Sequence, residues 1–163
     1  MTAAITFETV DFAQPTHCAA LVALLDEYAQ TPEGGGQALT AHVRERICSL
    51  LQSRPYYVGW IAFSGTKPVG LINCFEGVST FRAQPLLNVH DIVVSAAYRR
   101  RGIGRSLIEH AERHARDKGY CKLTLEVLEG NQSARTVYAG CGFRPYALDP
   151  AMGRAIFLEK KFF

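Results

Sequence analysis

Residues 98–105, with the sequence YRRRGIGR, bring four arginines and two glycines together between a strand-like run and a helical pattern. The first backbone N–H groups of a helix have no partner within the helix and carry partial positive charge. Gly102 and Gly104 lack a Cβ, so a bulky phosphate can approach these donors closely. The segment therefore predicts a site for a phosphate-bearing ligand, and the arginines add long-range attraction.

Three other interpretations of this segment are a solvated helix start with an ordinary turn, a nucleotide site of another class, and a nucleic-acid surface. A Walker loop needs a lysine after its last glycine, and none follows Gly104. A dinucleotide fingerprint needs a third glycine where Leu107 stands. No basic stripe recurs elsewhere, and the net charge is only +3. We therefore expect neither ATP nor NAD, and no nucleic-acid partner.

The composition is that of one globular domain. The chain has 163 residues, of which 48% are hydrophobic, so we expect a single domain over residues 1–163. Its five cysteines are odd in number and form no C-x-x-C pair, which disfavours a disulfide framework or a zinc site. The first residues lack the pattern of a secretory signal, and no apolar run is long enough to span a bilayer. These features favour a cytoplasmic protein with no metal site and no membrane contact.

The elements predicted before the arginine cluster are strands and two helices. Residues 5–10 alternate weakly as a strand, and apolar residues recur at helical spacing over 15–28 and 40–52. Residues 56–63 and 69–75 flank a compact turn sequence and predict an antiparallel hairpin. A loop over 76–85 and a strand over 87–94 then lead into the cluster.

Beyond the cluster, a helix is predicted over 104–117, a strand over 123–127, a helix over 131–139, and strands over 143–148 and 155–160. A hairpin meander followed by a strand–helix–strand unit is typical of a mixed sheet with helices on its faces. We therefore predict a mixed α/β (α+β) fold. Its mixed, mostly antiparallel sheet has six to seven strands and is flanked by about four helices.

Two motifs in this order resemble those of the GNAT superfamily of N-acetyltransferases. The first is R-x-x-G-x-G beginning at Arg99, and the second is N-x-x-A-x-x-x-Y-x-x-x-G-F beginning at Asn131. The resemblance covers residues 87–143, and the predicted order of the other elements agrees with that fold to both ends. It implies acetyl-CoA as cofactor, with its pyrophosphate held by the first motif. The residues concerned are Arg99, Arg100, Arg101, Gly102, Ile103, Gly104 and Arg105.

The resemblance also implies how the rest of the cofactor is held. In GNAT proteins the strand before the loop splays away from its successor, so that its backbone can pair with the pantetheine arm. Ile92 and Val94 occupy those positions here. Asn131 is expected to cap its helix and to contact the arm, and Ser133 to add a polar contact. Tyr138 matches a tyrosine that protonates the departing CoA thiolate, and a phenol with an ordinary pKa of about 10 stays protonated at neutral pH.

The implied reaction is direct attack of an amine on the thioester, which requires that the amine first lose a proton. His90 is the candidate base, because a neutral imidazole is available at pH 7. Period-two alternation places Asn88 and His90 on the strand face that includes Ile92 and Val94, and Asp91 on the opposite face. A β-bulge would reverse the placement of Asp91. A packed core histidine is the other interpretation of His90.

The acceptor pocket in this fold usually draws on the segment between the first two helices and on the loop before the motif strand. These are residues 28–37 and 76–85. The candidate acceptor contacts are Tyr28, Glu33, Gly35, Glu76 and Asn88. Because acidic side chains and Arg82 are both present, charge alone does not choose among an amino acid, a polyamine, an aminoglycoside and a protein N-terminus.

The sequence therefore predicts an acetyl-CoA-dependent N-acetyltransferase that acts on a primary amine of a small molecule. Two alternatives stay open: a non-catalytic acyl-CoA-binding or regulatory module, and a protein N-terminal or lysine acetyltransferase. Tyr138 favours an enzyme. The open edges of the sheet would allow a homodimer, although no particular interface is predicted.

Overall fold

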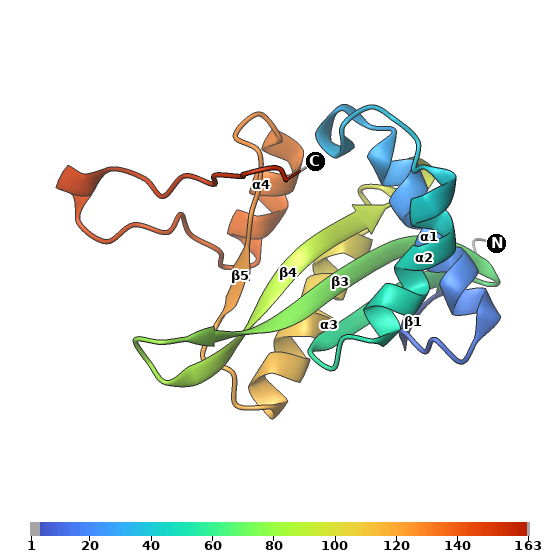
Figure 1. The fold of residues 1–163 in the computed structure, drawn as a ribbon, viewed down its shortest axis with the longest axis horizontal. Coiled ribbons are helices and arrows are strands. Elements are labelled where there is room, and N and C mark those ends of the chain that lie inside the picture. Colours follow the sequence, from blue (N-terminus) through green and yellow to red (C-terminus); the bar gives the residue numbers. More distant parts are fainter. Residues whose placement is uncertain (1–3, 163) are drawn as a thin grey trace.

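The computed structural model describes residues 4–162, and its centre is a five-stranded sheet with the strand order β1-β2-β3-β4-β5 (Figure 1). The strands are β1 (Ile5–Thr9), β2 (Tyr57–Ser64), β3 (Lys67–Ser79), β4 (Gln84–Val94) and β5 (Leu123–Leu125). The first four pair antiparallel, whereas β5 runs parallel to β4. The predicted mixed, mostly antiparallel sheet is confirmed, with five strands in the described residues instead of six or seven.

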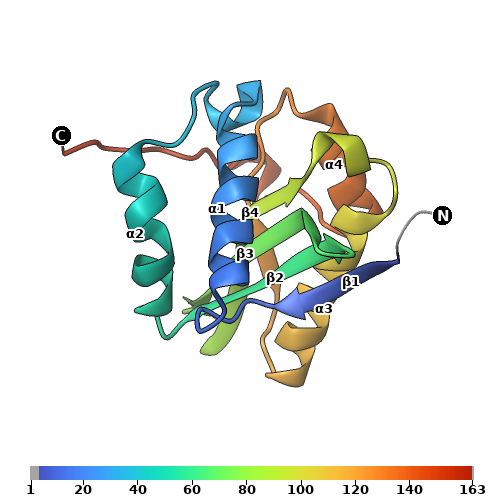
Figure 2. The same cartoon turned by 90° about the vertical axis from the view of Figure 1, so that its right-hand side faces the viewer.

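The two faces of the sheet are covered by different helices. Helices α1 (Pro15–Ala29) and α2 (Ala41–Gln52) lie on one face, α3 (Ile103–Asp117) lies on the other, and α4 (Gln132–Gly140) lies near β5 (Figure 2). On the α1 face Leu21 and Leu24 are buried with Leu71, and on the α3 face Leu107 is buried with Ile72. Apolar stripes at helical spacing thus meet both sides of the sheet, as the sequence predicted.

The hairpin of β3 and β4 is longer than expected. The predicted loop over residues 76–85 is wrong, because β3 continues to Ser79 and β4 begins at Gln84, which are paired with each other. The outer part of this ribbon projects beyond the sheet (Figure 1), and Phe81 at its turn is 99% exposed. Backbone pairing of Ser79 with Gln84 extends the ribbon, and this pairing leaves no local pattern in the sequence that would reveal it.

A β-bulge interrupts the pairing of β3 with β4. Asn73 is opposite Asp91, while the next residue, Cys74, is opposite Val89, so His90 is an extra residue in β4. An extra residue shifts the alternation of side chains by one position, and every later residue of β4 changes face relative to an unbroken strand.

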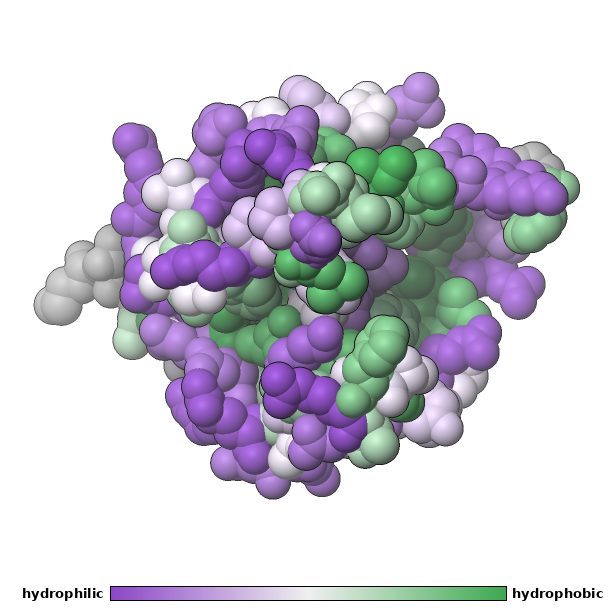
Figure 3. Space-filling model, turned by 90° about the vertical axis from the view of Figure 1, so that its left-hand side faces the viewer, coloured by the Kyte–Doolittle hydropathy of each residue, from purple (hydrophilic) through white to green (hydrophobic). Residues whose placement is uncertain are grey.

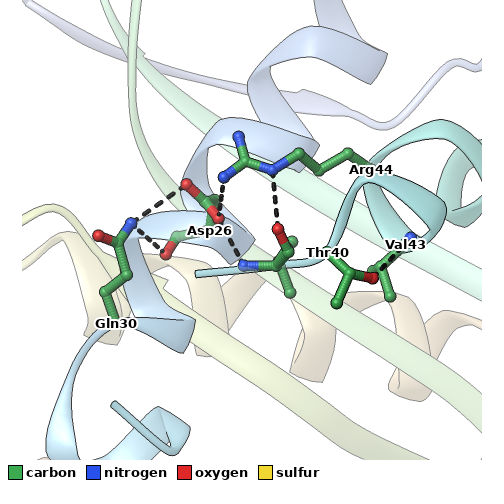
Figure 4. A network of polar contacts seen from close by, with 6 residues as sticks. Asp26, Gln30, Thr40, Val43 and Arg44 are labelled. Carbon is green, nitrogen blue, oxygen red and sulfur yellow. Dashed lines mark hydrogen bonds and ion pairs between the residues drawn. The ribbon is translucent and has the colours of Figure 1, made fainter. Parts of the chain in front are cut away.

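The segment between α1 and α2 is tied down at Asp26 (Figure 4). The Asp26 carboxylate accepts hydrogen bonds from the Leu39 backbone N–H at 2.8 Å and from Arg44 Nη2 at 2.8 Å. Thr40 Oγ1 accepts a hydrogen bond from the Val43 N–H at 3.3 Å, so Thr40 is the N-cap of α2. These contacts fix both ends of residues 30–40, which border the sheet near the end of β4.

The C-terminal segment differs from the prediction. Residues 143–148 and 155–160 form no strand, and the segment leaves α4 and runs outside the sheet with one short 3-10 helix at Pro150–Met152 (Figure 1). Its end projects at the right of Figure 3, beside a hollow where apolar side chains gather. Leu148, Ile156 and Leu158 are exposed. β5 ends at Leu125, not at Val127, so it offers only a short edge for pairing.

Candidate active site

The loop before α3 has the backbone geometry of an anion site. Arg100 and Gly102 both adopt the left-handed region, with φ of 62° and 80°. Alternation of right- and left-handed residues turns successive N–H groups towards one point and forms a concave anion nest. For a side chain larger than glycine this conformation costs on the order of 1 kcal/mol, so Arg100 carries strain of the kind found at functional sites.

The start of α3 continues this nest. Its N-cap is Gly102, which has no side chain to bond the free N–H groups of the first turn. An ideal Cβ on Gly104 would meet only Val94 Cγ2 within 4 Å, at 3.6 Å, which is an ordinary contact. The protein itself therefore has room for a side chain at Gly104. What glycine keeps open is the approach of a ligand to the backbone.

Three of the four arginine side chains brace the loop. Arg99 Nε donates to the Val94 carbonyl at 3.2 Å, and Arg105 Nη2 donates to the Gly140 carbonyl at 3.4 Å. The Arg101 guanidinium lies 4.9 Å from the centre of the Tyr98 ring. The contacts that the loop offers to a ligand are therefore mainly those of its backbone, while the charges of the side chains add attraction at longer range.

The edge of β4 next to this loop is free. β4 pairs with β5 only from Leu87 to Val89, and beyond that point β5 has no residue opposite Ile92 and Val94 in the described part of the chain. Backbone groups at the edge of a sheet are available to a ligand that takes the place of a strand. On α1, the Glu27 carboxylate accepts the Ala96 N–H at 2.9 Å and holds the chain that leaves this edge.

Ser133 and Tyr138 lie in α4, and Asn131 directly precedes it. Asn131 Oδ1 accepts the Ala134 N–H at 3.1 Å, which confirms it as the N-cap of α4, and Ser133 is exposed in the first turn. Tyr138 is buried against Phe143, with 6.0 Å between the ring centres. Burial is the main cause that raises the pKa of Tyr138 to about 12, so its phenol keeps its proton at neutral pH.

The bulge changes which side chains accompany His90. Ile92 and Val94 pack against the α3-face core, whereas Val93 belongs to the α1-face core. The expectation that Asn88 and His90 share a face with Ile92 and Val94 is therefore wrong, because alternation is broken between them. His90 is exposed and packs edge-on against Phe75 at 5.4 Å between ring centres.

Asp91 lies on the same side as His90, beside a buried polar chain that the sequence analysis did not find. The Tyr57 hydroxyl donates to Asn73 Oδ1 at 2.8 Å, and Asn73 Nδ2 donates to Asp91 Oδ2 at 3.0 Å. Tyr28 lies near enough that the charge on Asp91, after burial, raises the pKa of the Tyr28 phenol. In the sequence, only the possibility of a β-bulge in the strand over 87–94 indicated that Asp91 could lie on the face opposite to the one expected from unbroken alternation.

The predicted acceptor residues are only partly brought together. Glu33 lies near Tyr28, whose hydroxyl is 3.5 Å from the Glu33 carbonyl oxygen, and Gly35 follows in the left-handed region with φ of 106°. Asn88 Nδ2 donates to Thr124 Oγ1 on β5 at 3.1 Å. Tyr28, Glu33 and Gly35 therefore border the α1 face, while the Asn88 amide is engaged between β4 and β5.

Glu76 is separated from the other predicted acceptor residues. It shares the strand face of Cys74, which belongs to the core under α3, and its carboxylate accepts a hydrogen bond from the Tyr120 hydroxyl. That bond, together with burial as the larger cause, raises the pKa of Tyr120 to about 12. Glu76 therefore lies on the α3 face of the sheet, whereas Asp91 and Asn73 lie on the α1 face.

Among residues 4–162, no group of three His, Cys, Asp or Glu side chains is placed to hold a metal ion. No helix in that part of the chain is both long and apolar enough to cross a membrane. The features left to explain are the concave backbone nest, the free edge of β4 that precedes it in the chain, and the buried phenol of Tyr138 on α4.

Residues 19–143 match the family model described as the acetyltransferase (GNAT) family. The chain belongs to this family. The matched residues include the nest, the free edge of β4 and Tyr138, so the GNAT resemblance drawn from the two motifs is confirmed, and with it the expected class of acetyltransferase enzyme. GNAT enzymes use acetyl-CoA.

Proteins similar to this chain are named as acetyltransferases of different acceptors. This GNAT chain is 27% identical over 124 residues to thialysine N-epsilon-acetyltransferase of Caenorhabditis elegans. The matched residues make up 76% of this chain and 75% of that protein. It is also 38% identical over 78 residues to streptothricin acetyltransferase of Streptomyces lavendulae, and this match covers 48% of this chain and 41% of that protein. The chain thus spans less than half of the latter relative.

The same fold occurs in the crystal structure of the aminoglycoside N-acetyltransferase AAC(6')-Iy in complex with CoA. The two chains superpose with a TM-score of 0.74 over 99% of this chain and 97% of the other, at 15% sequence identity. At that identity the likeness establishes the fold. The acceptor of this GNAT chain has to be argued from its own residues.

Proposed function

We propose that this protein transfers the acetyl group of acetyl-CoA to a primary amine of a small molecule. The observation that carries the proposal is the continuity of two backbone sites: the nest at Arg100 and Gly102, and the free edge of β4 at Ile92 and Val94. The nest suits the pyrophosphate of CoA, and the strand edge suits its amide-containing pantetheine arm.

The residues of the donor site have distinct proposed roles. The backbone of residues 99–105 binds the pyrophosphate, and Asn131 and Ser133 at the start of α4 contact the arm. These groups require no metal: they use N–H donors and helix polarity to neutralise the phosphates. The arm would then lead the thioester along β4 towards Tyr138 and the bulge.

The proposed chemical step uses His90 at the bulge of β4 and Tyr138 on α4. The amine nitrogen attacks the thioester carbonyl, a C–N bond forms and the C–S bond breaks. Backbone N–H groups of β4 are suited to stabilise the oxyanion. His90 takes a proton from the incoming ammonium, and Tyr138 donates to the leaving thiolate. The raised pKa of Tyr138 keeps it available as a donor across the neutral range.

The names of relatives support a small-molecule reaction, and the state of the cysteines bears on the compartment. Relatives are named for thialysine, streptothricin and aminoglycosides, each of which carries amines. All five cysteines are free, in keeping with the reducing cytoplasm that the sequence favours. A protein acetyltransferase remains the second candidate, since relatives with other acceptors share the fold.

The proposal is tested by calorimetric titration with acetyl-CoA, CoA and NAD, followed by thiol-release assays with spermidine, L-lysine, kanamycin and an N-terminal peptide. We expect binding of both CoA species, no binding of NAD, and thiol release with at least one of the small amines. Binding of CoA without amine-dependent thiol release would favour the non-catalytic module, and release with the peptide alone would favour the protein acetyltransferase.

A further inference from the structure

Asn73 is the central residue of a polar chain buried inside the sheet. Its side chain is 1% exposed, and it receives a hydrogen bond from the Tyr57 hydroxyl and donates one to Asp91. A buried amide is stable only when both of its ends are paired, and here they are. If the amide were reversed, its oxygen would face the Asp91 carboxylate oxygen, so the hydrogen bonds to Tyr57 and Asp91 go with one orientation of the amide.

The chain ends in a carboxylate that has no cation beside it. Among the described residues no lysine, arginine or histidine forms an ion pair with Asp91, whereas Asp26, Glu112 and Glu129 each have an arginine partner. Asp91 is half-buried, and burial of a carboxylate without a positive charge is costly. Its position fits a site that is completed by a cation from outside.

The surroundings of Asp91 also favour an organic cation. Tyr28, Tyr57 and Phe75 all pack against the α1-face core, and His90 lies edge-on to Phe75. Aromatic faces attract ammonium groups that have left water, in addition to the attraction of the carboxylate. Glu33 follows Tyr28 in the chain segment held by Asp26, and its negative charge adds to the field in the same region.

We propose that Asp91, held in place by Asn73 and Tyr57, binds the ammonium group of the acceptor. This inference rests on the proposed function and deepens it, because it commits the acceptor to a cationic aliphatic amine and disfavours a neutral arylamine. Asp91 touches the substrate, and Asn73 and Tyr57 are positioning residues that act through it. The network lies at the bulge, next to the edge of β4 along which the thioester would be held.

The proton balance agrees with separate roles for Asp91 and His90. The ammonium group has three protons and the product amide keeps one, so two must leave. One passes to His90 and then to solvent, and the other reaches the CoA thiolate by way of Tyr138. Asp91 takes no part in these proton transfers and keeps the amine oriented towards the thioester carbonyl.

The first test measures binding of spermidine, L-lysine and kanamycin, each in turn, by calorimetry to the protein saturated with CoA. The variants are Asp91→Asn and, as a matched control, Asp117→Asn, which removes an equal charge at the far end of α3 on the opposite face. We expect at least tenfold weaker amine binding for Asp91→Asn and no change for Asp117→Asn. Equal effects of the two variants, or no effect of Asp91→Asn, would overturn the inference.

The second test separates positioning from simple support of the fold. Tyr57→Phe keeps the ring that packs against Phe12 and Phe75 and removes only the hydroxyl donor. We expect the KM for the amine to rise about fivefold, with the KM for acetyl-CoA unchanged, as follows from loss of one orienting hydrogen bond. A parallel rise of both KM values, or no rise of either, would contradict the positioning role.

The outcomes distinguish this inference from the proposed function. A protein that binds CoA but none of the three cationic amines, or that acetylates aniline faster than all of them, overturns the Asp91 site and leaves the CoA site intact. A protein that does not bind CoA overturns the proposed function itself.

Discussion

Replacement of Gly104 by alanine should raise the stability of the free protein while it weakens CoA binding. The added Cβ would lie 3.6 Å from Val94 Cγ2, a normal contact, and would meet no other atom within 4 Å. Gly104 has helical backbone in α3, where alanine is favoured by up to about 1 kcal/mol. For a chain of this size that corresponds to a rise in Tm of about 2–4 °C.

The effect on the ligand has the opposite sign. A methyl group at residue 104 would hold a phosphate away from the N–H groups of the first turn, and the loss of one hydrogen bond to a charged group costs about 1.5–3 kcal/mol, at least tenfold in affinity. With CoA at 100 times the wild-type Kd, the wild type gains about 2.7 kcal/mol of stability. A variant that binds tenfold more weakly gains only about 1.4 kcal/mol.

Thermal unfolding with and without CoA, combined with calorimetric titration, measures both effects. The variant should unfold above the wild type when free and below it with CoA. Asp117→Ala is the control, because it also favours the helix but lies at the other end of α3; it should be more stable in both conditions. Unchanged CoA affinity in Gly104→Ala would refute the assignment of the pyrophosphate to this backbone.

Three other predictions concern the phenol and the interhelical segment. Tyr138→Phe should lower kcat by at least tenfold with little change in CoA affinity, measured by thiol release and calorimetry; an unchanged kcat would remove Tyr138 as the acid. Because the folded-state pKa of Tyr138 is about 12 and the unfolded value is about 10, its proton stabilises the fold fully below pH 10, and that contribution is lost as the pH rises to 12. Between pH 10 and 12 the free energy of unfolding, measured with urea, should therefore fall by about 2 kcal/mol more in the wild type than in Tyr138→Phe. Equal decreases in the two proteins would contradict burial of the phenol. Asp26→Ala should lower the free energy of unfolding by about 2 kcal/mol, because the hydrogen bonds from Leu39 and Arg44 are lost. The control Glu45→Ala, at an exposed position, should change the free energy of unfolding little. A decrease for Asp26→Ala no larger than that for the control would show that residues 30–40 are held by other contacts.

Local signals predicted the elements that form the proposed donor site. Helix starts, caps and glycines act over a few residues, so the Asn131 cap and the loop before α3 could be placed from sequence. The structure adds what no local pattern contains: the left-handed conformation of the non-glycine residue Arg100, and the bonds by which Arg99 and Arg105 are directed away from the nest.

The acceptor half depended on the alternation of β4, and that alternation is broken. Because His90 is an extra residue, the side chains that follow it change face, and Asp91 joins the side where Asn73 and Tyr57 form their chain. The face on which Glu76 lies was not predicted for a related reason, since it is decided by pairing in a ribbon that was expected to be a loop. Strand partners are distant in sequence, and so is the information on register.

The C-terminal strands show the limit of periodicity alone. The alternation over 143–148 and 155–160 is suited to a strand, but strand formation needs a partner, and β5 is only three residues long. The exposed side chains of that segment are the result.

The most direct test of the account follows the acetyl group. Acetyl-CoA labelled with carbon-13 in the acetyl group is incubated with the wild type and with spermidine, L-lysine or kanamycin, and the products are identified by NMR and mass spectrometry. The account predicts label in a new amide of at least one of these amines, formed more slowly by Tyr138→Phe. Label that stays on CoA, or that is found only as free acetate, would contradict it.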